Sequence, residues 1–148
     1  IKVYDIDNRV WIPDSTNRYF LILKNNKTCL SCYNTLLTYL MKLKGNNSNN
    51  KIMIISHVDS TVLARKLEYK RVRTLVPGID DILFDYKGDD YPMGYNETMN
   101  HASIFYKYQV DITPALLLFD KGNISYYSYK DIYTPNGDIN KGISILLK

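Results

Sequence analysis

The chain has 148 residues, 45% of them hydrophobic and 23% charged, and a formal net charge of +4. A chain of this length fits one folded domain (1–148) that buries enough surface to fold without a disulfide scaffold. Its mild charge, without a basic stretch interleaved with aromatic residues, argues against nucleic-acid binding, and no apolar run approaches the roughly 20 residues of a membrane helix.

The first half of the chain alternates predicted strands with predicted helices. Mostly continuous apolar runs indicate strands buried on both faces, whereas apolar residues that recur every three to four positions indicate helices. The predicted elements are a β-hairpin over 1–14 that turns at Asp7-Asn8, a strand at 18–24, a helix that ends at Gly45, a strand at 51–58, and a helix from Ser60, its N-cap, to about Val72.

The second half continues the alternation and ends with a hairpin and a helix. The predicted elements are a short edge strand at 81–85, a helix at 96–108, strands at 114–120 and 123–129 joined by a turn at Lys121-Gly122, and a helix at 138–148 with Ile139, Ile143 and Leu146 facing inward.

This order of elements predicts an α/β fold. Strand–helix–strand alternation implies parallel pairing through right-handed crossovers, with helices on both faces of the sheet. The last hairpin must add an antiparallel strand, so we expect a mixed central sheet in a three-layer α/β/α sandwich.

Basic residues gather at 65–73 and acidic residues gather at 80–90. We interpret these two groups as a solvated helix face followed by a polar loop. A docking surface for an acidic partner is the alternative interpretation.

The only two cysteines, Cys29 and Cys32, stand between the predicted strand at 18–24 and the helix that follows it. The first turn of a helix has unpaired backbone N–H groups and the positive end of the helix dipole, and both favour a thiolate. A cysteine in such a place has a lowered pKa, and Lys27 adds a nearby positive charge. We predict that Cys29, at the exposed end, attacks a partner disulfide and that Cys32, one turn inside, resolves the mixed disulfide.

Two other interpretations of the cysteine pair stay open. A structural zinc site needs four ligands, and His57 and His101 lie far downstream and far apart. A copper site made of the two thiolates and one histidine is the remaining metal alternative. The pair can also be a structural or regulatory disulfide. The leading interpretation needs no metal and no other cofactor.

A second stretch, Val110–Tyr127, supports a redox site. Pro114 opens a strand, where its missing N–H does least harm. A cis Thr113–Pro114 bond, the isomer found in about 5–6% of X-Pro bonds, would bend the chain sharply here. Thr113 would then offer its backbone N–H and C=O to an extended peptide beside the cysteines.

With these residues the chain resembles a thioredoxin-like protein of the TlpA/ResA type, related to the AhpC/TSA redoxins. "TCLSC" occupies the position of the active-site CxxC, "KIMIISHVDS" resembles the next strand, and "FYKYQVDITPALLLFDKGNIS" resembles the segment that holds a Thr-Pro motif and a D-x-x-G-x-I hairpin. The resemblance implies a thioredoxin-like sandwich with an N-terminal β-hairpin extension. It also implies that Thr113–Pro114 is a cis-proline motif that faces Cys29.

Four positions depart from the family's usual pattern. Thr28 stands where an aromatic residue, often Trp, precedes the first cysteine, and Ser31 stands where Pro commonly precedes the second. Leu23 falls near the buried acid of thioredoxins, and Thr35 falls near a Glu that is often found in the TlpA branch. His57, at the end of a central strand, is the candidate replacement for the missing base, with an ordinary surface histidine as the alternative.

We therefore predict a thiol–disulfide oxidoreductase whose partners are protein thiols or disulfides. The competing hypothesis is a non-catalytic thioredoxin-like binding module. TlpA-like proteins usually sit outside the cytoplasm, and the chain opens with Ile1 rather than Met, as a trimmed product would. We expect an extracytoplasmic location, periplasmic or anchored to a membrane by a segment outside this chain.

Overall fold

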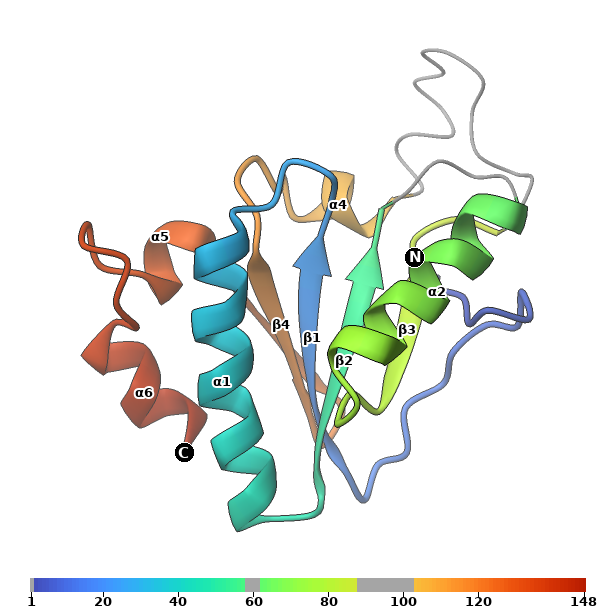
Figure 1. Cartoon of the computed structure of the whole chain (residues 1–148). Helices are drawn as coiled ribbons and strands as arrows, with labels where there is room; N and C mark the ends of the chain where they lie inside the picture. Colours follow the sequence, from blue (N-terminus) through green and yellow to red (C-terminus); the bar gives the residue numbers. More distant parts are fainter. Residues whose placement is uncertain (1, 58–61, 88–102) are drawn as a thin grey trace.

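The computed structural model describes residues 2–57, 62–87 and 103–148 (Figure 1). Its centre is a mixed five-stranded sheet in the order β3-β2-β1-β4-β5. The strands are β1 (Arg18–Lys24), β2 (Asn50–Ser56), β3 (Asp81–Phe84), β4 (Ala115–Asp120) and β5 (Asn123–Tyr127). β1, β2 and β3 run parallel, whereas β4 is antiparallel to β1 and β5 is antiparallel to β4. The strand order of the sheet therefore confirms the expected mixed α/β architecture.

Helices lie on both faces of the sheet (Figure 1), and each face carries its own cluster of buried apolar side chains. One face packs against α1 (Leu30–Asn46), α2 (Val62–Leu75), α5 (Tyr129–Ile132) and α6 (Lys141–Leu147). The other face packs against α4 (Ile104–Lys107) and the N-terminal segment, with Val3, Trp11 and Phe105 in contact with it. β1 lies at the centre of the sheet, so side chains from both of its faces are buried.

Helix α1 forms because its leucines recur at helical spacing on one side. Leu36 and Leu40 are completely buried against the sheet, which is the stripe that an amphipathic helix needs. The helix runs one residue past the predicted stop at Gly45 and ends where the backbone N–H of Asn47 bonds to Leu43 O at 3.2 Å.

The C-terminal helix starts later than the sequence predicts. The side chain of Asn140 caps the helix by accepting a bond from Gly142 N, so α6 begins at Lys141. Ile139 instead forms a single β-bridge with Tyr133. The prediction that Leu146 faces inward is wrong, because Leu146 is 61% exposed. Leu147 is fully buried in its place, four residues after the buried Ile143.

The N-terminal hairpin is held by two backbone bonds between its arms, Asp5 N to Arg9 O and Trp11 N to Val3 O, and by side-chain bonds in its turn. Tyr4 and Val10 form one antiparallel bridge, and Tyr4 also bridges to Phe84 at the edge of the sheet. The Asp5 carboxylate accepts bonds from the backbone N–H groups of Asp7 and Arg9 inside the turn. The hairpin therefore covers the free edge of β3, which protects that edge from pairing with another chain.

The interpretation of the basic stretch as a solvated helix face is wrong at Arg65. This residue is 3% exposed, and its guanidinium lies 4.2 Å from the centre of the Phe84 ring. Its Nη1 also donates to Asn8 Oδ1 at 2.7 Å. Leu63 and Leu67, on the same helix, are 68% and 60% exposed. Arg65 therefore joins α2 to the N-terminal turn, a contact that charge patterning does not reveal.

Several predictions fall partly or wholly outside the described residues. They concern the N-cap at Ser60 and most of the helix at 96–108, including His101; within the described part, that helix corresponds to α4. Among the described helices, none has both the length and the apolar character that a membrane span requires.

Candidate active site

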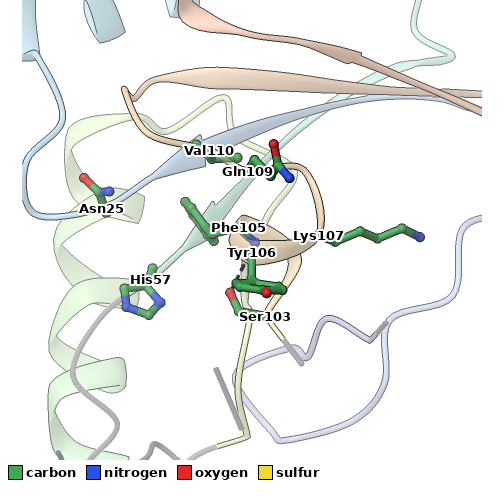
Figure 2. Close-up of a pocket in the computed structure, with 8 residues that line it drawn as sticks. All are labelled: Asn25, His57, Ser103, Phe105, Tyr106, Lys107, Gln109 and Val110. Atoms are coloured by element: carbon green, nitrogen blue, oxygen red, sulfur yellow. Dashed lines mark hydrogen bonds between the residues drawn. The ribbon is translucent and has the colours of Figure 1, made fainter. Parts of the chain in front are cut away.

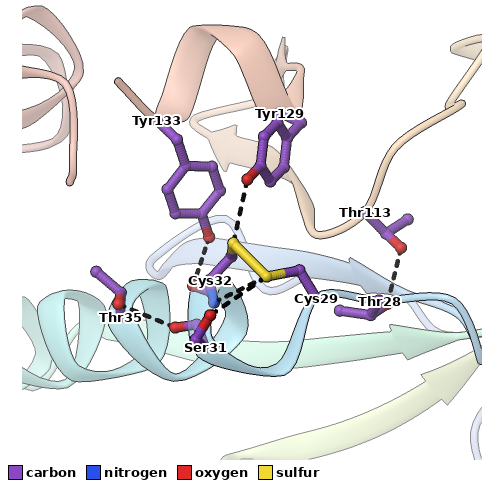
Figure 3. Close-up of a disulfide and its surroundings, with 8 residues drawn as sticks. All are labelled: Thr28, Cys29, Ser31, Cys32, Thr35, Thr113, Tyr129 and Tyr133. Carbon is purple, nitrogen blue, oxygen red and sulfur yellow. Dashed lines mark hydrogen bonds between the residues drawn. A yellow bond between two sulfur atoms is a disulfide. The ribbon is translucent and has the colours of Figure 1, made fainter. Parts of the chain in front are cut away.

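Cys29 and Cys32 form a disulfide where the loop after β1 meets helix α1 (Figure 3). Cys29 is the N-cap of the helix, and the two Cα atoms lie 5.4 Å apart. Cys29 is half-buried and Cys32 is 8% exposed. Cys29 is therefore the more accessible of the two cysteines.

The sulfur of Cys29 lies in a positively polarised environment. The backbone N–H of Cys32 donates to Cys29 Sγ at 3.4 Å, and the hydroxyl of Ser31 lies 3.4 Å from the same sulfur. The first turn of α1 holds no acidic residue. These donors and the helix dipole stabilise negative charge on Cys29 once the disulfide is reduced.

Two tyrosines from the short helix α5 and its end hold the inner cysteine (Figure 3). The hydroxyl oxygen of Tyr129 lies 3.1 Å from Cys32 Sγ, and Tyr133 donates to Cys32 O at 2.6 Å. Burial, with a smaller contribution from Tyr129, raises the pKa of Tyr133, so its hydroxyl stays protonated. The sequence pattern reveals neither tyrosine as a site residue, because it predicts Tyr129 at the end of a strand and α5 is too short to show helical periodicity.

The structure brings Thr113 and Pro114 beside the cysteines. The Thr113–Pro114 peptide bond is cis, and Thr113 O accepts a bond from Cys29 N at 3.4 Å. The hydroxyl of Thr113 lies 2.8 Å from that of Thr28 and donates to Asn25 Oδ1 at 2.9 Å. Side-chain bonds thus tie the proline loop to the loop that carries the first cysteine.

His57, the predicted auxiliary base, is directed elsewhere. Its Nδ1 lies 2.6 Å from Asp85 Oδ2, and its ring packs near those of Tyr86 and Phe105. Burial lowers the pKa of His57, but the hydrogen bond and charge of Asp85 outweigh burial and raise the pKa above its usual value. His57 and Asn25 line a cavity of about 530 Å³. Figure 2 shows the residues of this lining, and neither cysteine belongs to its described part.

The other predicted auxiliary position, Lys27, is exposed, and its backbone N–H donates to Asn25 Oδ1 at 2.9 Å. Leu23, at the place of the buried acid, is completely buried among apolar side chains. Thr35 donates its hydroxyl to Ser31 O within α1. Among the described residues, no three histidine, cysteine or acidic side chains gather closely enough to hold a metal ion.

A buried ion pair, which the sequence analysis did not anticipate, lies between β1 and α2. Lys24 Nζ and Glu68 Oε1 are 2.9 Å apart, and each side chain is about 10% exposed. Burial raises the pKa of Glu68, but its bonds to Lys24 and Arg71 outweigh burial and leave the pKa below its usual value. Tyr33, the residue after Cys32, is also buried, and burial together with the charge of Glu68 raises its pKa to about 12.

Comparison with solved structures finds several chains of similar shape. A thioredoxin-like protein from Porphyromonas gingivalis matches with a TM-score of 0.58 at 14% identity, over 88% of this chain and 79% of that one. A secreted disulfide oxidoreductase from Mycobacterium tuberculosis, homologous to DsbE of E. coli, matches with a TM-score of 0.57 at 13% identity, over 99% and 93%. StoA from Bacillus subtilis matches with a TM-score of 0.51 at 14% identity, over 86% and 87%.

No protein-family model and no curated protein matches the chain. At these low identities the structural likeness establishes the fold, and the chain has the thioredoxin-like fold that the sequence predicts.

Proposed function

We propose that this chain is a thiol–disulfide oxidoreductase of the TlpA/ResA type that exchanges disulfides with protein substrates. The observation that carries the proposal is the placement of the Cys29–Cys32 disulfide at the N-terminus of α1, with the half-buried Cys29 beside the Thr113–Pro114 loop. Cys29 is the nucleophile and Cys32 is the resolving thiol. We further propose that residues 1–148 act as one thioredoxin-like domain.

The proposed reaction is thiol–disulfide exchange through a mixed disulfide. In the reducing direction, the Cys29 thiolate attacks a substrate sulfur and releases the other substrate sulfur as a thiolate. The Cys32 thiolate then attacks Cys29 Sγ, which closes the Cys29–Cys32 disulfide and frees the reduced substrate. The oxidising direction is the reverse of these steps, so the same two residues serve both.

The substrate backbone is proposed to bind along Thr113. Its carbonyl already accepts the N–H of Cys29, but a carbonyl oxygen has two lone pairs and can accept a second bond. The neighbouring Ile112 is 44% exposed and offers an apolar contact to a substrate side chain.

An extracytoplasmic location is part of the proposal. It is supported by the similarity to a protein that is described as secreted, and such compartments let disulfides persist.

Insulin-disulfide reduction and mixed-disulfide trapping test the proposal. Cys32→Ser should capture a substrate protein through Cys29, because the trapped disulfide can no longer be resolved, whereas Cys29→Ser should capture none. Wild type should reduce insulin faster than Cys29→Ser. Equal background rates for both, with nothing trapped by Cys32→Ser, would contradict the proposal.

The completely buried Leu23, in the place of an ionisable acid, favours a second candidate. In it the chain is a binding module whose disulfide is structural or regulatory. A reduction potential below about −300 mV for the Cys29–Cys32 pair would favour this candidate.

A further inference from the structure

The hydroxyl of Tyr129 lies against the inner sulfur, at 3.1 Å from Cys32 Sγ (Figure 3). A cysteine in a disulfide carries no S–H, so in this contact Tyr129 donates and the sulfur accepts. A sulfur that becomes a thiolate accepts the same bond more strongly, because charge-assisted hydrogen bonds are roughly twice as strong as neutral ones.

The position of Tyr129 is set by several contacts around it. Ser128 and Asp131 form a capping box at the start of α5, which fixes the first turn of the helix. The centroids of the Tyr129 and Tyr133 rings lie 4.7 Å apart, and the Tyr133 hydroxyl donates a hydrogen bond to Cys32 O. The donor is thus held in place before any thiolate forms, which is the arrangement that stabilises developing charge best.

The other candidates for this role do not reach the sulfur. Leu23 has no proton to give and is buried among apolar side chains. His57 instead bonds to Asp85 at 2.6 Å, in a cavity whose described lining includes neither cysteine.

We propose that Tyr129 is a catalytic residue that donates a hydrogen bond to the Cys32 thiolate, both when this sulfur leaves Cys29 and when it attacks the mixed disulfide. The role rests on the proposed function and names the group that replaces the missing acid.

The exchange step balances without any further reactant. A substrate thiolate attacks Cys29 Sγ, a bond forms between these two sulfurs, and the Cys29–Cys32 bond breaks. The electron pair of the broken bond moves to Cys32 Sγ, where the O–H of Tyr129 stabilises it without giving up its proton. A second substrate thiolate then attacks the substrate sulfur of the mixed disulfide, which forms the substrate disulfide and releases Cys29 as a thiolate. The substrate thus loses two electrons and the chain gains them.

The first test is the rate at which glutathione reduces the Cys29–Cys32 disulfide in Tyr129→Phe. This variant keeps the ring against Tyr133 and loses only the O–H. We expect the rate constant to fall about 3- to 10-fold, because the leaving thiolate loses a hydrogen bond. The matched control is Tyr39→Phe, whose hydroxyl bonds to Ser144 O at 3.1 Å, away from the disulfide. Tyr129→Phe reacting no more slowly than Tyr39→Phe would overturn the inference.

The second test is a pH profile, which a merely structural role would not move. In a Cys29→Ser background, the rate of Cys32 alkylation by iodoacetamide is followed against pH with and without Tyr129→Phe. We expect its midpoint to move up by roughly half to one pH unit, which corresponds to the same fold-change in thiolate stability. Superimposable profiles would overturn the inference, and circular dichroism checks that each variant is folded.

Both tests use small molecules and no protein substrate, so they separate the inference from the proposed function. Protein exchange that persists unchanged in Tyr129→Phe, with unchanged small-molecule rates, defeats the inference alone. A Tyr129 effect on Cys32 without any insulin reduction or trapping defeats the proposed function and leaves the hydrogen bond supported.

Discussion

At the scale of single residues, Thr28 has a structural role that the sequence around the cysteines does not suggest. Where the family that the sequence resembles has an aromatic residue, the hydroxyl of Thr28 joins two loops. Its Oγ1 accepts a bond from Asn25 N at 2.9 Å and lies 2.8 Å from Thr113 Oγ1. An aromatic side chain at this position could not form these bonds. Thr28 therefore links the cysteine loop to the proline loop through hydrogen bonds.

Replacing Thr28 with Val keeps the shape of the side chain and removes both hydrogen bonds. We expect the free energy of unfolding to fall by about 1–2 kcal/mol, because two partly buried polar groups lose a partner. The matched control is Thr38→Val, whose hydroxyl bonds to Asn34 O on the exposed side of α1; its effect should stay within about 0.5 kcal/mol. Urea unfolding of both variants gives the comparison, and equal losses would contradict the role assigned to Thr28.

At the scale of elements, one buried carboxylate joins three segments of the fold. Asp85 follows β3, is 3% exposed, and bonds to His57 at the end of β2 and to Ser103 at the start of α4. The distances to its Oδ2 are 2.6 Å from His57 Nδ1 and 2.8 Å from Ser103 Oγ. Asp85 therefore holds His57 and Ser103, two residues that line the cavity in Figure 2.

The His57–Asp85 pair makes stability depend on pH in a defined direction. Because Asp85 raises the folded-state pKa of His57, the stabilisation is fully present below the unfolded value of about 6.5 and is lost as pH rises through the higher folded pKa. We expect the stability difference between wild type and His57→Gln to shrink from about pH 6 to about pH 8.5. Both proteins should carry His101→Gln, so that no other histidine titrates. A difference that is constant or grows with pH would contradict the assignment.

The Lys24–Glu68 pair links β1 to α2 and should respond to acid in the opposite sense. Its bonds lower the pKa of Glu68, so its contribution is present above the unfolded value of about 4.3 and is lost as pH falls through the lower folded pKa. At neutral pH, Glu68→Gln should cost about 2–3 kcal/mol, since Lys24 keeps a buried charge without its partner.

A double variant of Glu68→Gln with Lys24→Met provides the control for this pair. Removing both charges should recover part of the loss, because no unpaired buried charge remains. Chemical unfolding at pH 7 gives the free energy of unfolding of wild type, of each single variant and of the double variant. If the double variant lost as much stability as the two single variants together, the two side chains would not interact.

At the scale of the whole molecule, the sheet was the most predictable part. β1 lies at 18–24, where the apolar run predicts it, since a central strand buried on both faces leaves an unbroken hydrophobic signal. The turn at Lys121-Gly122 was equally clear, because Gly122 takes a positive φ of 83° that favours glycine. α5 was missed because four residues hold too little periodicity to distinguish a helix from the end of a strand.

The candidate site was predictable only in part, for a physical reason. The cysteine pair and the Thr-Pro motif are local patterns, and their positions follow from the order of the elements. The bonds of Thr28 to Thr113, and of Tyr129 to Cys32, join residues 85 and 97 positions apart. Such contacts depend on how loops and a short helix pack in three dimensions, and no spacing in the sequence reports them.

The reduction potential of the Cys29–Cys32 pair decides whether this disulfide is redox-active. Equilibration of the protein in glutathione buffers, with the reduced fraction read by thiol alkylation, gives the value. A redox-active pair should have a reduction potential between about −120 and −270 mV, the range of active dithiol proteins. A potential below about −300 mV would mark a disulfide that resists reduction, and the pair would then not be redox-active.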